Sequence, residues 1–153
     1  MLQSCWHYQH QLPISSILLI TPTILVQPTN SFKYIFSVCN TKMESELLKT
    51  IQSNKLSADL LYKNKFYTQA TTLYFKTLFS VCDYVILKST GNAPKSHVER
   101  FSAMKTQFPD LYLINDKYFP IYQQTYTSQI DKPTCDIIKQ NVEKLIKEKG
   151  IQI

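Results

Sequence analysis

The chain has 153 residues, a mass of 17.8 kDa and a net charge of +6, which is the size of one ordinary domain. Hydrophobic residues make up 44% and charged residues 18%, a composition typical of a globular protein. The 2 glycines are too few for a glycine-rich phosphate loop, a dinucleotide-binding fingerprint or a nucleophile elbow, because these motifs need several glycines at fixed spacing. Proteins that depend on those motifs are therefore excluded.

The basic charge permits attraction to a polyanion but does not specify one. The chain has 17 basic and 11 acidic side chains, and Arg100 is its single arginine. Arginine is the preferred residue for bidentate recognition of phosphates and bases, whereas lysine acts as a point charge. The composition thus allows binding to nucleic acid without predicting sequence-specific reading.

Residues 1–42 differ from the rest of the chain. They contain no acidic residue, and their apolar run from Leu12 to Val26 is shorter than the roughly 20 residues that span a bilayer. No Lys or Arg precedes this run, so the basic region of a signal peptide is missing. We expect residues 1–42 to be a leader, either disordered or produced by upstream translation, and residues 43–153 to be the functional domain. A weak interfacial membrane anchor is the alternative for the leader.

The cysteines predict reduced thiols in a cytoplasmic protein. The four cysteines have no CxxC spacing and no small disulfide framework around them. One group, Cys5, His7 and His10, has residue types that bind metals, but it lies in the expected leader. We therefore predict no metal site and no cofactor, and we expect no transmembrane segment.

From Met43 onward the apolar residues recur at helical spacing. The pattern predicts a first helix over residues 44–63, ended by Asn64 in the left-handed conformation. A second helix is predicted over residues 66–89 and is closed by Gly91. Because this second helix is apolar on all sides, we expect it to be the central helix of a bundle.

The remaining helices are predicted from their start and stop signals. Ser96 and Glu99 form a capping box at the start of a third helix, which Pro109 stops. A fourth helix is predicted over residues 110–128, with Pro120 kinking it or marking a fresh start. The last helix is expected to begin near Pro133 and to end before Gly150. The fold class predicted from these signals is all-α, a bundle of four to five helices.

One candidate site lies at the start of the third helix. His97 comes directly after the N-cap, where the helix dipole lowers the pKa of an imidazole and leaves it neutral, as a general base or a ligand requires. Lys95, His97 and Arg100 together form a small basic cluster at a helix N-terminus, a candidate site for an anion or nucleic acid. The alternative is a solvated helix end in which Arg100 pairs with a nearby acid.

Tyrosines supply the second candidate site. Most of the 10 tyrosines fall at helical spacing and are expected in the core or at its edge. Tyr122 and Tyr126 lie four residues apart after Pro120, beside polar neighbours. They are the tyrosines that we expect to stack on a base or to contact a partner.

A family resemblance rests on the first two predicted helices and the start of the third. Ser57–Tyr62 (SADLLY) and Phe66–Phe79 (FYTQATTLYFKTLF) place small and aromatic residues on either side of a short turn, and Pro94–His97 then opens a third helix. Over about residues 44–149 the chain resembles the prokaryotic and archaeal HEPN domains, small helical proteins commonly encoded beside minimal nucleotidyltransferases.

The resemblance implies an up-and-down helical bundle that forms a homodimer and acts in an RNA-directed or toxin–antitoxin setting. Many members are metal-independent ribonucleases whose arginine precedes a histidine by a few residues. Here Arg100 comes after His97 and no histidine comes after it, so the ribonuclease role is not carried over. We therefore predict a non-catalytic binding or regulatory module whose partner is a minimal nucleotidyltransferase, RNA or a nucleotide.

Two other functions are open. Leu61, Tyr67, Ala70 and Tyr74 also look like one helix pair of a tetratricopeptide adaptor, although the pattern is not repeated at the required spacing of about 34 residues. A divergent HEPN ribonuclease that uses His97 with Arg100 is the enzymatic alternative.

Overall fold

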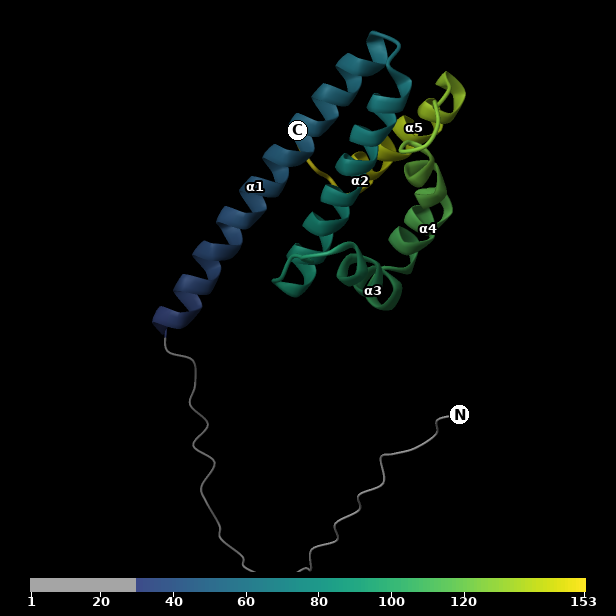
Figure 1. Cartoon of the computed structure of the whole chain (residues 1–153). Helices are drawn as coiled ribbons and strands as arrows, with labels where there is room; N and C mark the ends of the chain where they lie inside the picture. Colours follow the sequence, from purple (N-terminus) through teal and green to yellow (C-terminus); the bar gives the residue numbers. More distant parts are fainter. Residues whose placement is uncertain (1–29) are drawn as a thin grey trace, which may run out of the picture.

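The structure, a computed structural model, describes the backbone of residues 30–153 and the side chains of residues 41–153. It consists of five helices, α1 (Asn30–Lys63), α2 (Tyr67–Thr90), α3 (His97–Gln107), α4 (Pro109–Gln124) and α5 (Lys132–Glu148), as Figure 1 shows. Residues 30–153 contain no strand, so the predicted all-α class is confirmed. Among these five helices, none combines the length and the apolarity that crossing a membrane requires.

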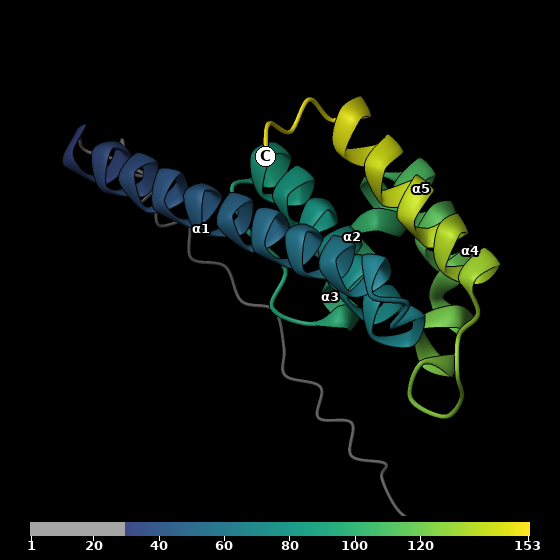
Figure 2. The same ribbon diagram turned by 90° about the horizontal axis from the view of Figure 1, so that it is seen from above.

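Helix α2 is the centre of the bundle. It lies between α1 on one side and α4 and α5 on the other (Figures 1 and 2), and it contacts each of the other four helices. Of its 24 residues, 13 are buried, on all sides of the helix. The prediction that the second helix is central is confirmed, since a helix that is apolar all round must be covered all round.

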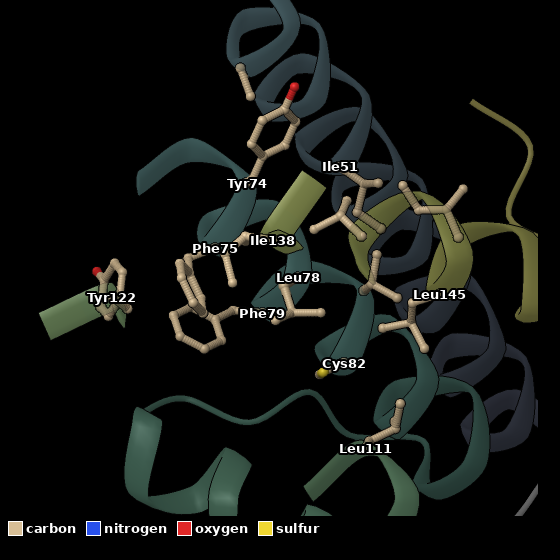
Figure 3. Close-up of a cluster of buried hydrophobic side chains, with 14 of the residues drawn as sticks. Ile51, Tyr74, Phe75, Leu78, Phe79, Cys82, Leu111, Tyr122, Ile138 and Leu145 are labelled. Carbon is tan, nitrogen blue, oxygen red and sulfur yellow. The ribbon is translucent and has the colours of Figure 1, made fainter. Parts of the chain in front are cut away.

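The core has an aliphatic part and an aromatic part, seen on either side of α2 in Figure 3. Ile51 of α1 and Ile138 and Leu145 of α5 are fully buried against α2 on the aliphatic side. On the other side Phe75 and Phe79 point toward Tyr122 of α4, with ring centroids 5.3 Å away in each case. The aromatic part therefore joins α2 to the α3 and α4 region, where the candidate site lies.

Helix starts and stops agree with the local signals at three places. Gly91 ends α2 with a φ of 76°. Pro133 lies in the first turn of α5, and the Asp131 side chain caps this helix by accepting from the Thr134 backbone N–H at 3.0 Å. Gly150, with a φ of 63°, lies just after the end of α5.

The capping box of α3 forms in a modified way. The Ser96 hydroxyl accepts from the Glu99 backbone N–H at 3.2 Å, as predicted. The Glu99 carboxylate, however, accepts from the backbone N–H of Lys95 at 2.7 Å, one residue before the N-cap. The Ser96 hydroxyl therefore satisfies the orphan amide of Glu99, and the Glu99 carboxylate ties the residue before the N-cap to the first turn of α3.

The first helix begins earlier than predicted. α1 starts at Asn30 and passes the expected boundary at Met43 without interruption, so the predicted start at Glu44 is wrong. The physical reason is that no proline or glycine occurs between Pro28 and the end of α1. The rest of the predicted leader, residues 1–29, lies outside the described residues, and the group of Cys5, His7 and His10 lies there too.

The fourth helix also differs from its prediction. Pro109 occupies the first position of α4 rather than only stopping α3, and the helix runs through Pro120 to Gln124. Pro120 therefore does not start a new helix, because packing of α4 against α2 and α3 outweighs the lost backbone hydrogen bond. Tyr126 lies in the turn after the helix, which ends before the predicted Ser128.

The turn between α1 and α2 places the left-handed residue one position later than predicted. Lys65 has a φ of 64°, whereas the Asn64 side chain donates to the Leu60 carbonyl at 2.8 Å. The backbone N–H of Lys65 donates to Tyr62 and that of Phe66 to Leu61, both at 3.0 Å. These two bonds are those of a Schellman motif, with a lysine in the position that glycine usually fills.

We predict that Lys65→Gly raises the free energy of unfolding by about 0.5–1 kcal/mol, because glycine adopts a positive φ without the clash of a Cβ atom. Lys65→Ala is the matched control, since it removes the charge and keeps the Cβ atom. Urea denaturation measures both variants. A glycine variant no more stable than the alanine variant would contradict the prediction.

Candidate functional site

A shallow cavity of about 410 Å³, wide open to solvent and almost wholly apolar, lies between α3 and α4. It is lined by His97, Val98 and Phe101 from α3 and by Phe119 from α4. The volume lies within the range of small-molecule sites, which are apolar with few polar groups. Val98 is 79% exposed, so the cavity has an apolar residue at its edge that no residue among 41–153 covers.

A cluster of rings forms the floor beneath the cavity. The His97 ring packs edge-to-face on Phe79 of α2, with centroids 5.0 Å apart, and lies 6.3 Å from Phe119. Phe119 in turn lies 5.3 Å from Phe101 and 5.9 Å from Tyr122. Such ring pairs contribute about 0.5–1.5 kcal/mol each beyond the area they bury. The cluster therefore holds three helices in fixed positions around the cavity.

Arg100 is held by an acid from α2. Its Nε and Nη2 donate to the two carboxylate oxygens of Asp83 at 2.6 and 2.7 Å, and each side chain is only 12% exposed. The guanidinium also lies over the Phe79 ring, 5.0 Å from the centroid. The alternative in which Arg100 pairs with a nearby acid is therefore the observed one, and its charge is neutralised within the protein.

His97 is joined to the same ion pair. Its Nδ1 lies 2.9 Å from Nη1 of Arg100. Burial lowers the pKa of His97, and the neighbouring Arg100 charge lowers it further, whereas Asp83 acts in the opposite direction. The direction agrees with the prediction from sequence, but the causes are burial and Arg100, in place of the helix dipole.

The structure brings together only part of the predicted basic cluster. His97 and Arg100 are in contact, whereas Lys95 precedes the N-cap, is exposed and does not line the cavity. Within residues 41–153 the cluster therefore offers one unpaired cationic side chain, that of Lys95, instead of two.

The two predicted tyrosines have different environments. Tyr122 is 9% exposed and belongs to the ring cluster, whereas Tyr126 is 70% exposed. The hydroxyls of Tyr126 and Tyr122 are hydrogen-bonded to each other at 2.6 Å, and burial raises the pKa of Tyr122 to about 12. Of the two, Tyr126 is the one whose ring is available to a partner.

Several residues of the site are not identified by sequence reasoning. Phe101 is partly buried and lines the cavity. Phe119 and Val98 also line the cavity and are not predicted, because helical spacing does not show which neighbouring helix a residue faces. Asp83 does carry a signal, since a single acid within the apolar stretch of residues 78–87 needs a partner when buried.

Residues 41–153 contain no group of three His, Cys, Asp or Glu side chains placed to hold a metal ion. Comparisons of the chain with protein-family models, curated proteins and solved structures found no match. The resemblance to HEPN domains therefore stays a prediction from the residues alone.

We predict that Arg100→Met lowers the free energy of unfolding by about 3 kcal/mol, because it leaves the buried Asp83 carboxylate without its partner. The double variant Asp83→Leu with Arg100→Met removes both charges and should lose much less. Urea denaturation of the single and double variants measures the difference. If the single and the double variant lost the same free energy of unfolding, the prediction would be contradicted.

We also predict that His97 titrates below the ordinary histidine pKa of 6.5. Because the folded protein binds this proton less readily than the unfolded chain, the contribution of His97 to stability is fully present above pH 6.5. That contribution is lost as the pH falls from there through the folded-state pKa. An NMR titration of the ring protons measures the pKa, and His97→Gln should lack this part of the pH dependence of unfolding. A pKa at or above the ordinary value would contradict the prediction.

Proposed function

We propose that residues 43–153 form a small non-catalytic binding module, resembling HEPN domains, that takes up an unpaired base of RNA or of a nucleotide in the cavity between α3 and α4. The observation that supports this most directly is the cavity itself, of about 410 Å³, with Phe101, Phe119 and His97 among its four lining residues. Aromatic rings are the stacking platforms of single-strand binding proteins, where each stacked base contributes about 1–3 kcal/mol.

The charges near the cavity favour recognition of the base over recognition of the phosphate. Arg100 directs two of its donors to Asp83 and a third to His97, and so offers little to a phosphate group. Lys95 is the exposed cation beside this helix end. We therefore expect binding that depends on stacking and falls only gently with salt, with a slope of about −0.7 for each phosphate that a lysine neutralises.

The biological setting is proposed from the resemblance alone. By analogy with HEPN domains, the module would act as a homodimer in the cytoplasm, as the regulatory partner of a minimal nucleotidyltransferase in a toxin–antitoxin type of system. A divergent ribonuclease receives less support, since the Arg100 guanidinium is engaged by Asp83.

A protein-interaction role is the second candidate, and one observation favours it. Val98, 79% exposed, lies at the edge of the cavity and presents an apolar side chain that a protein partner would bury. An adaptor of the tetratricopeptide type would use such a surface without any affinity for RNA.

We predict that a short single-stranded RNA binds the protein and that Phe101→Ala weakens this binding at least about tenfold, because one stacking ring is lost. Fluorescence anisotropy of a labelled oligonucleotide measures the dissociation constant at several salt concentrations. Phe66→Ala is the matched control, since Phe66 is an exposed phenylalanine at the turn between α1 and α2 and does not line the cavity.

The result separates the two functions. Binding that Phe101→Ala weakens and Phe66→Ala leaves unchanged supports base recognition. An absence of RNA and nucleotide binding at low salt would overturn the proposal of base recognition and leave the adaptor as the function to test. A steep dependence on salt would mean that surface lysines bind the RNA and that the cavity does not.

A further inference from the structure

We propose that a second pocket, between the end of α2 and α3, binds an alkylammonium group through the Glu99 carboxylate. This α2–α3 pocket has a volume of about 260 Å³ and is open to solvent. It is lined by residues of α2, of the loop that leads from α2 to α3 (Figure 1) and of α3, namely Ile86, Thr90, Asn92, Ala93, Pro94, Glu99, Ala103 and Gln107. It shares no lining residue with the cavity between α3 and α4, so the inference is independent of the proposed function.

The lining of the α2–α3 pocket combines polar and apolar atoms. Four of its eight residues, Ile86, Ala93, Pro94 and Ala103, have hydrocarbon side chains. Glu99 is the single charged residue of the lining, and it is acidic although the whole chain carries +6. A ligand that matches this lining has a short aliphatic part and a positively charged end.

The Glu99 carboxylate has one engaged oxygen and one free oxygen. Its Oε2 accepts from the backbone N–H of Lys95 at 2.7 Å, which holds the carboxylate beside the loop that lines the pocket. Among residues 41–153 no cationic side chain pairs with Glu99, and Arg100, the next residue of α3, is engaged by Asp83. The carboxylate is therefore available to a cationic donor from outside the chain.

The end of α2 adds to the negative potential of the pocket. Ile86 and Thr90 lie in the last two turns of this helix, where the backbone carbonyls form the negative end of the helix dipole. The Thr90 hydroxyl donates to the Ile86 carbonyl at 2.9 Å and accepts from the Asn92 backbone N–H at 3.2 Å. These bonds fix the wall of the pocket opposite α3, so a cation meets a preformed, electronegative surface.

An organic cation matches the pocket better than a metal ion does. Residues 41–153 contain no group of three His, Cys, Asp or Glu side chains placed to hold a metal, and a single carboxylate leaves most ligand positions of a divalent ion to water. A primary ammonium group has three donors, and its aliphatic chain packs on hydrocarbon side chains. Such a group occurs in a free alkylamine and at the end of a lysine side chain of another protein.

Three probes test the proposal, because n-butylammonium, methylammonium and n-butanol separate the charged end from the aliphatic part. We expect the full chain to bind n-butylammonium about fivefold more tightly than methylammonium, since additional methylene groups are partly buried. We expect a preference of about fivefold or more over n-butanol, since only the ammonium makes a charge-assisted hydrogen bond. Chemical-shift titration by NMR, followed at the backbone signals of Asn92 and Ala103, measures the dissociation constants. Equal binding of the three probes, or no shift of these signals, would overturn the proposal.

Glu99→Gln removes the charge and leaves an acceptor for the Lys95 N–H group, as glutamine does in a capping box. It should weaken n-butylammonium binding about threefold or more, the contribution of an exposed ion pair, and leave n-butanol binding unchanged. Glu46→Gln is the matched control, since Glu46 is exposed on α1 and lines neither the pocket nor the cavity. An equal loss in the two variants would mean that only the net charge acts and would overturn the proposal.

A fourth probe, lysine with its backbone blocked as an N-acetyl methylamide, identifies the source of the ammonium group. If it binds as tightly as n-butylammonium, the pocket admits a lysine side chain of another protein. If it does not bind and n-butylammonium does, the pocket takes free alkylamines. Either result supports an alkylammonium site, and neither affects the test of RNA binding, which depends on Phe101 in the other cavity.

Discussion

The hydrogen-bonded ion pair between Asp83 of α2 and Arg100 of α3 determines where the third helix lies. α3 has 11 residues and fully buries only Met104, while Phe101 and Ala103 are partly buried against the core, so hydrophobic burial accounts for only part of its attachment to the bundle. Arg100 adds two hydrogen bonds to Asp83, of 2.6 and 2.7 Å, and a contact over the Phe79 ring, all of which attach α3 to α2. The ion pair thus attaches α3 to α2 next to the cavity between α3 and α4, and the same arginine contacts His97 at 2.9 Å.

The central helix divides the molecule into a scaffold and a site. On the scaffold side, aliphatic residues of α1 and α5 close around α2, and the Tyr74 and Tyr62 hydroxyls donate to the carboxylates of Asp59 and Asp136 between these helices. On the site side, the packing includes an ion pair, a histidine and a buried Asn115, whose Oδ1 has no hydrogen-bond partner within the described part of the chain.

Net charge and local charge lead to different expectations for the ligand. The chain carries +6, which favours a polyanion at long range. Near the cavity, however, the arginine is neutralised by Asp83, and the lining is almost wholly apolar. For the nucleic acid proposed as ligand, long-range attraction would act at the surface, and discrimination at the cavity would depend on stacking. This division explains why lysine-rich composition and an aromatic site are compatible in one small protein.

The sequence by itself determined the helical class, the central place of the second helix, and the helix ends marked by Ser96, Gly91 and Pro133, because these signals act within one turn of the backbone. It also predicted that His97 titrates low and that Arg100 could pair with an acid. Only the tertiary structure decided that the acid is Asp83, 17 residues away on another helix, and that Phe101 and Phe119 face a shared cavity. It likewise decided that Tyr122 is buried while Tyr126 is exposed, and that α1 extends back to Asn30. Helical spacing fixes which face of a helix a residue occupies, whereas the neighbour that this face meets depends on how separate helices pack, and local sequence signals do not specify that packing.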